Sequence, residues 1–96
     1  MPKVAIAAVI PLQKKLEQVL ADGFKVAGIH ATIETERVPT TKLVRATVVS
    51  KQFEHLRLTE RQDLVWRIVD QAFKPEEQIR LSIWTLTPDQ MDYGSD

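Results

Sequence analysis

Apolar residues at three- and four-residue spacing predict one long helix in the second half of the chain, from Thr59 to Phe73. Thr59 can cap its start, and Gln62, three positions on, can return the hydrogen bond in a capping box. Lys74 suits the last turn because a cation interacts favourably with the helix dipole, and Pro75 cannot donate the next backbone hydrogen bond. One apolar stripe of this helix should face the core: Leu64, Val65, Ile68, Val69, Ala72 and Phe73.

Alternation of apolar and polar residues predicts three strands. The last strand, Ile79 to Leu86, follows the long helix. The first lies within an alternation from Phe24 to about Glu36 and is centred on Ile29 to Glu34, with a bulge expected at Gly28, where the phase changes. After a break the alternation resumes from Leu43 to Val49, so these two strands should form a hairpin.

Two further helical segments complete the pattern. A stripe from Leu12 to Leu20 predicts a first helix, with Pro11 at its first position and Gly23 as its left-handed end. A short helical turn over Lys51 to Glu54 should carry Phe53 into the core. The order helix, strand, strand, short helix, long helix, strand predicts an α+β domain with a three-stranded sheet covered by helices on one face.

Composition limits the chain to one modest core. It has 96 residues, 44% of them hydrophobic, and a formal net charge of 0, so no global electrostatic attraction draws it to nucleic acid or to an anionic membrane. Cys is absent, which excludes disulfides, thiol catalysis and Cys-ligated metal sites formed by this chain alone.

The two ends differ from the domain between them. Residues 1–10 contain the apolar run from Val4 to Ile10, which is much shorter than the roughly 20 residues of a membrane helix. This run could add an edge strand, pack on a helix or pair with a second copy. Residues 11–88 should form the domain, and residues 89–96 an acidic C-terminal tail. We expect a cytoplasmic protein that does not enter a membrane.

Three stretches, VVSKQFEHL, ERQDLV and LSIWTLTP, resemble the BolA-like family. Its members read as an extended VVS, a Phe-Glu-Gly turn, an Arg-His-Arg helix start and a final LSI-x-T-x-TP strand. The likeness runs from about Leu12 to Pro88. It implies the BolA-like fold, a mixed three-stranded sheet similar to the class II KH topology, and a monothiol glutaredoxin as the class of partner.

The sequence departs from this family at its metal-ligating histidines. A His just before the last strand serves the relatives that share an iron–sulfur cluster with a glutaredoxin, whereas this chain has Ile79 there, or Arg80 if the alignment slips by one residue. Gln62 and Leu43 stand near the other two histidine positions. Neither an aliphatic side chain nor a guanidinium ligates iron, so the sequence argues against cluster sharing and predicts no bound cofactor or metal.

Two histidines remain, and no catalytic constellation accompanies them. His55 replaces the Gly of the Phe-Glu-Gly turn, and whether it substitutes for the missing ligand is left open; His30 falls on the polar side of the first strand. The chain has no Gly-flanked Ser, no Gly-rich phosphate loop and no KH-type Gly-x-x-Gly. We therefore do not expect an enzyme.

The outer face of the sheet is the first candidate for a binding surface. If the helices cover the side with Ile29, Val44 and Leu81, the opposite side carries these residues: His30, Thr32, Arg45, Thr47, Arg80, Ser82 and Trp84. A Trp between arginines can stack on a partner side chain or a base. Trp84, Arg45, Arg80 and His30 are accordingly the predicted partner-binding residues. Trp66, beside the main stripe of the long helix, is a second exposed candidate.

These observations leave two hypotheses from different classes. The first is a non-enzymatic BolA-like regulatory or adaptor domain that binds another protein, either a second copy of itself or a different chain. The alternative is a KH-related, transcription-regulatory protein that binds nucleic acid through a basic surface. Five residues would form that surface: Lys42, Arg45, Lys51, Arg57 and Arg61.

Overall fold

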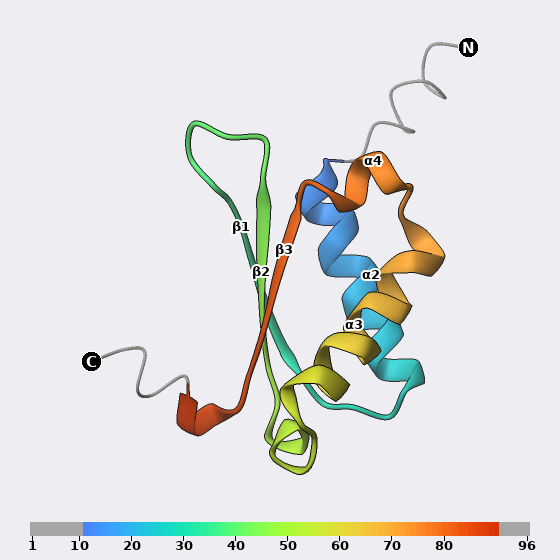
Figure 1. Cartoon of the computed structure of the whole chain (residues 1–96), viewed down its shortest axis with the longest axis vertical. Coiled ribbons are helices and arrows are strands. Elements are labelled where there is room, and N and C mark those ends of the chain that lie inside the picture. Colours follow the sequence, from blue (N-terminus) through green and yellow to red (C-terminus); the bar gives the residue numbers. More distant parts are fainter. Residues whose placement is uncertain (1–10, 91–96) are drawn as a thin grey trace.

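The structure, a computed structural model, describes residues 11–90 and places a layer of helices on one face of a three-stranded sheet (Figure 1). The sheet contains β1 (Thr32–Arg37), β2 (Val44–Val49) and β3 (Leu81–Leu86) in that spatial order. β1 pairs antiparallel with β2, and β2 pairs parallel with β3. The predicted α+β fold with a mixed sheet covered on one face is thus confirmed.

Four helical segments precede β3 among residues 11–90. These are α2 (Leu12–Val26), the 3-10 helix η1 (Lys51–His55), α3 (Leu58–Ala72) and α4 (Pro75–Gln78). α3 lies between β2 and β3 in the sequence and provides the crossover that a parallel strand pair needs.

The core lies between the sheet and the helices. Alternate residues of β2 and β3 supply the sheet side, and α2, η1 and α3 supply the other. Phe24 and Phe53 meet there edge to face, with ring centroids 6.2 Å apart. The predicted role of Phe53 is confirmed, because its side chain is fully buried. The fully buried large side chains are Phe24, Phe53, Leu16, Leu20, Val48, Val65 and Val69.

The first helix is longer than predicted, and Gly23 does not end it. α2 continues to Val26, and Gly23 lies inside it, beside the Ile68 side chain of α3. The left-handed residue after the helix is Gly28, with a φ of 74°. Gly23 is therefore a point of close approach between two helices, which a sequence pattern cannot distinguish from a helix end.

The predicted first strand was wrong over its first part. Phe24 and Val26 are helical, Gly28 forms no bulge, and β1 begins at Thr32 instead of Ile29. Phe24 continues the four-residue spacing of Leu16 and Leu20 into the core, and burial of this stripe outweighs the local alternation.

The start and end of the long helix also differ in detail. α3 starts at Leu58, and its capping contact runs from the backbone N–H of Arg57 to Oε1 of Glu60, at 2.8 Å, instead of through Thr59 and Gln62. Of the predicted stripe, Val65, Val69 and Phe73 are buried, Leu64 and Ile68 are half-buried, and Ala72 is exposed.

A short helix that the sequence pattern does not reveal separates α3 from β3. α4 starts with Pro75 at its first position, and the backbone N–H of Lys74 donates to Oε1 of Glu77 at 2.9 Å. Lys74 therefore precedes α4 instead of closing α3, and the last strand begins at Leu81 instead of Ile79. Four residues are too few for a recognisable helical period.

Near the C-terminus, the described residues Pro88 to Gln90 are helical. The backbone N–H of Thr87 donates to Oε1 of Gln90 at 2.9 Å, and the backbone N–H of Gln90 donates to Oγ1 of Thr87 at 3.4 Å. The apolar run from Val4 to Ile10 and the rest of the expected tail lie outside the described residues. Within residues 11–90, no helix is long and apolar enough to cross a membrane.

Candidate protein-binding face of the sheet

The face of the sheet opposite the helices is not covered by any described element (Figure 1). We call it the open face. Strand pairing arranges it in three rows, Glu36–Arg45–Ser82, Glu34–Thr47–Trp84 and Thr32–Val49–Leu86. In β2 and β3 these rows alternate with buried residues of the same strand, as a period of two requires.

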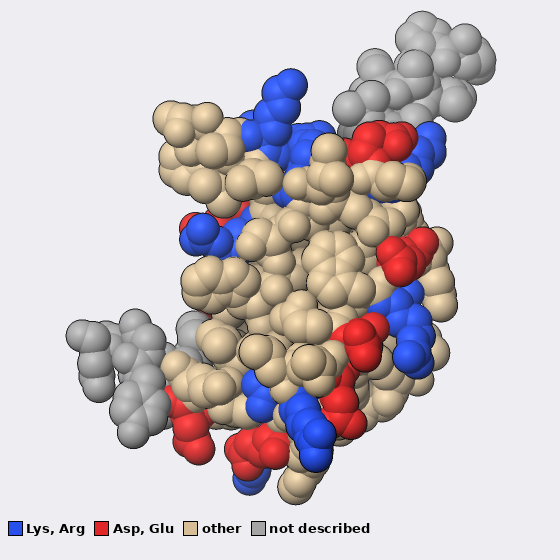
Figure 2. All heavy atoms as spheres, viewed as in Figure 1, with Lys and Arg blue, Asp and Glu red and all other residues tan. Residues whose placement is uncertain are grey.

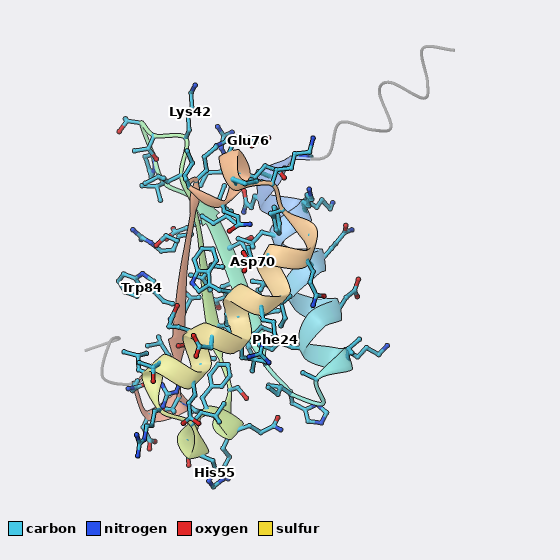
Figure 3. All side chains as sticks on the ribbon, turned by 45° about the vertical axis from the view of Figure 1, so that its right-hand side comes forward. Phe24, Lys42, His55, Asp70, Glu76 and Trp84 are labelled. Carbon is cyan, nitrogen blue, oxygen red and sulfur yellow. The ribbon has the colours of Figure 1, made fainter. Side chains whose placement is uncertain are left out.

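Trp84 and Arg45 form the most distinctive contact on the open face. Trp84 points away from the helices and is 54% exposed (Figure 3). The guanidinium carbon of Arg45 lies 5.4 Å from the centre of the Trp84 ring, within the range of a cation–π interaction. On its other side, Nη1 of Arg45 lies 3.1 Å from Oε1 of Glu36. Nε of Arg45 is buried and has no hydrogen-bond acceptor among the described residues.

Each of these three residues has its place fixed by the strands. The β1–β2 register puts Glu36 directly opposite Arg45. The β2–β3 register puts Trp84 opposite Thr47, which lies two residues after Arg45 in β2 and on the same face of the sheet. Glu36 was not among the residues predicted from sequence. The signal that reveals it is the hairpin register, which depends on the length of the turn between β1 and β2.

Arg80 and His30, the other predicted partner-binding residues, do not join this cluster. Arg80 precedes β3, and its Nε donates to the carbonyl of Lys42 at 2.9 Å, near the start of β2. His30 lies near the other end of β2, where its carbonyl accepts from Oγ of Ser50 at 2.7 Å. The length of β2, roughly 20 Å at about 3.3 Å per residue, separates the two. The expectation that Arg80 flanks Trp84 is therefore corrected.

The five basic residues predicted for nucleic acid do not form one surface. Lys42 precedes β2, whereas Lys51 and Arg57 follow it; Figure 3 shows Lys42 and His55, the last residue of η1, at opposite ends of the molecule. The Arg45 guanidinium already forms an ion pair with Glu36 and a cation–π contact with Trp84. Acidic and basic side chains alternate in the lower part of Figure 2 instead of separating into a positive patch.

Arg61, the last of the five, is part of the interior. It is only 8% exposed, and its Nε donates to the carbonyls of Phe53 and Leu56, both at 3.1 Å. Its Nη1 donates to Oε1 of Gln90 at 3.2 Å. The sequence gives only its charge, so the prediction that it lies on a basic surface was wrong.

The residues at the expected ligand positions lie on different elements. Ile79 follows α4 and is 79% exposed. Gln62, in α3, accepts from Nε1 of Trp66 at 3.2 Å and donates to Oγ1 of Thr85 at 3.4 Å. Trp66 is therefore half-buried and held against the core instead of forming a second exposed anchor. Within residues 11–90, no three His, Cys, Asp or Glu side chains converge in a way that could hold a metal ion.

A groove between α2 and α3 was also missed from the sequence, because Gly23 was interpreted as a helix end. It encloses about 550 Å³ on the side of the helices away from the sheet. Its apolar lining includes Val19, Gly23, Val26, Leu64, Ile68 and Ala72.

Comparison with known proteins defines the class of fold. No family model matches the chain, and no curated protein matches it in sequence. Among solved structures, BolA1 from Arabidopsis thaliana superposes with a TM-score of 0.58 at 21% sequence identity. The match covers 85% of this chain and 98% of that chain. The chain therefore has a BolA-like fold, as its sequence resemblance predicts.

Proposed function

We propose that this protein is a non-enzymatic BolA-like adaptor or regulatory domain that binds another protein through the open face of its sheet. The observation that carries the proposal is the exposed indole of Trp84 on β3, in contact with Arg45 on a sheet face that no described element covers.

Burial energetics support a protein partner. Covering the exposed part of an indole releases about 25 cal/mol for each Å² of apolar area removed from water. Trp and Arg are also the residues that most often dominate binding energy at protein interfaces. Arg45 is already oriented by Glu36 and Trp84, so little side-chain freedom is lost on binding. A fitting partner would place an apolar side chain on Trp84 and a hydrogen-bond acceptor near Arg45.

The resemblance to BolA-like proteins suggests a monothiol glutaredoxin as one such partner. In this proposal the two proteins associate without sharing an iron–sulfur cluster, because Ile79 stands where the relatives carry the ligand His. The proposal of a non-enzymatic role rests on the lack of Cys and of any phosphate-binding or nucleophile motif in the sequence.

Affinity capture from cell extract tests the proposed function. The tagged natural chain, Trp84→Ala, Arg45→Ala and Val26→Ala are compared, each with and without nuclease. Val26 is the matched control, because it is an apolar residue that is 89% exposed on α2, away from the open face. We expect one protein to be retained by the natural chain and Val26→Ala and lost with the other two variants, regardless of nuclease.

Two results would contradict the proposal. Capture that survives both open-face substitutions would place the binding surface elsewhere. Capture that disappears with nuclease, and that weakens steeply with added salt, would indicate nucleic acid, because phosphate contacts release counterions on binding.

A further inference from the structure

The outer edge of β3 carries backbone groups with no partner among residues 11–90. The ladder to β2 uses the even-numbered residues: the N–H of Val44 donates to the carbonyl of Arg80, and the N–H of Ser50 donates to that of Leu86. In a strand, successive residues direct their backbone groups to opposite sides. The N–H and C=O groups of Leu81, Ile83 and Thr85 therefore point away from β2, and none of them bonds to another described residue.

The two edges of the sheet differ in how they are protected. β1 reads TIETER, and its charged side chains discourage pairing with another strand. β3 reads LSIWTL and carries no charge, although it is equally long. An uncharged, unpaired edge of this kind is a template for an added strand.

We propose that β3 pairs antiparallel with β3 of a second copy of this chain, about a two-fold axis at Ile83, to give one continuous sheet across the dimer. This interaction uses the edge of β3, whereas the proposed capture of another protein uses the open face, so the two share only Trp84. In this register Ile83 faces its own symmetry mate, and Leu81 faces Thr85 of the second copy. Every outward N–H and C=O of these three residues then finds a partner.

The side chains favour this occupant over an unrelated extended peptide. The proposed register sets Ser82 opposite Trp84 of the second copy, so a small residue accommodates each indole. The two Trp84 side chains become diagonal neighbours on the joined open face, within reach of each other for aromatic residues. Trp84 is 54% exposed in a single copy, and in the dimer each Trp84 covers part of that exposed surface on the other.

The surroundings of β3 are compatible with such an approach. In the view of Figure 1, β3 passes in front of β2, and Figure 2 shows uncharged side chains over the middle of this side, with charged ones around it. On the helix side, the Gln62 side chain of α3 donates a hydrogen bond to Thr85 of β3, and Trp66 donates one to Gln62. The two-fold pairing leaves only the charged β1 strands as outer edges, so assembly stops at the dimer.

Sedimentation equilibrium of the purified natural chain is the first test. We expect the mass to shift with concentration toward twice that of the 11.0 kDa chain. A chain that stays at the mass of one copy throughout the micromolar range would overturn the proposal. The same result is expected if the β3 edge pairs with a different protein instead of with a second copy.

Disulfide trapping tests the register, and the absence of natural Cys makes it specific. Ser82→Cys and Trp84→Cys proteins are mixed and oxidised; opposed residues that are not hydrogen-bonded in an antiparallel pair have Cα atoms about 4.5 Å apart, close enough for a disulfide. Thr32→Cys, on the same face but on β1, is mixed with Trp84→Cys as the control. The S82C–W84C product should exceed both the control product and the self-products of either variant severalfold.

Equal trapping in the control mixture, or a dimer by mass without the S82C–W84C product, would show that the copies associate elsewhere and would overturn the β3 pairing. The test is independent of the proposed function. A monomer that still captures its partner through Trp84 removes only the dimer, whereas a natural chain that is a dimer by mass but captures nothing removes only the adaptor role.

Discussion

Arg61 shows how far the position of one residue can depart from what its charge suggests. Its guanidinium connects η1, the segment after it and Gln90, and its guanidinium carbon lies 5.8 Å from the centre of the Phe53 ring. A buried cation is tolerated only when its donors have partners, and here two main-chain carbonyls and one side chain supply them. Arg61 therefore stabilises the junction between these segments.

Replacing Arg61 with Ala should lower the free energy of unfolding by about 2–3 kcal/mol, because its charged hydrogen bonds are lost. The carbonyl of Leu56 then has no other donor among the described residues, whereas that of Phe53 keeps the backbone N–H of Leu56. Urea denaturation measures the change. Arg67→Ala, at an exposed position of the same helix, is the control and should change the stability by no more than about 0.5 kcal/mol. Equal effects of the two substitutions would contradict the structural role of Arg61.

Glu77 connects α4 to α2, and its protonation should be visible in the acid range. The hydrogen bond from the backbone N–H of Lys74 lowers the pKa of Glu77 from its ordinary 4.5, and the ammonium of Lys15, 3.3 Å away, acts in the same direction. As the pH falls, Glu77 is protonated in the unfolded chain before it is protonated in the folded one. The contribution of ionised Glu77 to the free energy of unfolding is therefore present above pH 4.5 and is lost as the pH falls below it.

The expected result is that Glu77→Gln removes this part of the pH dependence. Thermal unfolding of both proteins between pH 3 and 7 measures it: the natural chain should be slightly more stable near pH 7, and the difference should vanish at the acid end. Glu76→Gln, at an exposed position of α4, is the matched control. A difference that grows on acidification would mean that the pKa of Glu77 is raised instead.

At the scale of elements, the packing of α2 on α3 depends on Gly23. A Cβ at position 23 would lie 2.9 Å from Cδ1 of Ile68 and closer still to its Cγ2, and a β-branched side chain in a helix has few alternative rotamers. Gly23→Ala should therefore lower the free energy of unfolding by about 1–3 kcal/mol, although Ala is the better helix former by about 1 kcal/mol.

A double-mutant cycle makes this prediction specific. In the Ile68→Ala background the space is free, so the same Gly23→Ala change should raise the stability by up to about 1 kcal/mol. Chemical denaturation of the four proteins gives both values. The same sign in both backgrounds would show that Gly23 is not a packing position.

The same helix marks the limit of what the sequence pattern can predict. The long helix, the last two strands and the short turn with Phe53 were predicted to within about two residues, since their periods extend over enough residues to be recognised. The segment from Gly23 to Ala31 was misinterpreted because a Gly in a helix–helix contact and a Gly at a helix end look alike in sequence. α4 was missed because it is only one turn long.

At the scale of the whole molecule, the candidate site was predicted in part. Period-two alternation alone places Trp84 and Arg45 on the open face, and the structure brings them together. The contribution of Glu36 depends on hairpin register, and the separation of Arg80 from His30 depends on where the strands end. Burial of Arg61 depends on contacts with Phe53, Leu56 and Gln90 that no local pattern contains.

The proposed loss of the ligand histidines leads to a prediction for the molecule with its suggested partner. Mixing the chain with a cluster-bearing monothiol glutaredoxin should leave the visible absorption of the cluster unchanged, since Ile79 cannot ligate iron. His55→Ala and His30→Ala serve as comparison variants. A new spectrum typical of His ligation that disappears only in His55→Ala would contradict the prediction and identify His55 as the ligand.

The parallel pairing of β2 with β3 has a consequence for the order of folding. β1 and β2 are joined by a short turn and can pair early, whereas β3 can close the sheet only after α3 has formed and docked. Until then the inner edge of β2 is open in the nascent chain. Substitutions in the hairpin should therefore slow folding, and those in β3, such as Ile83→Val, should mainly speed unfolding, a difference that φ-value analysis would measure.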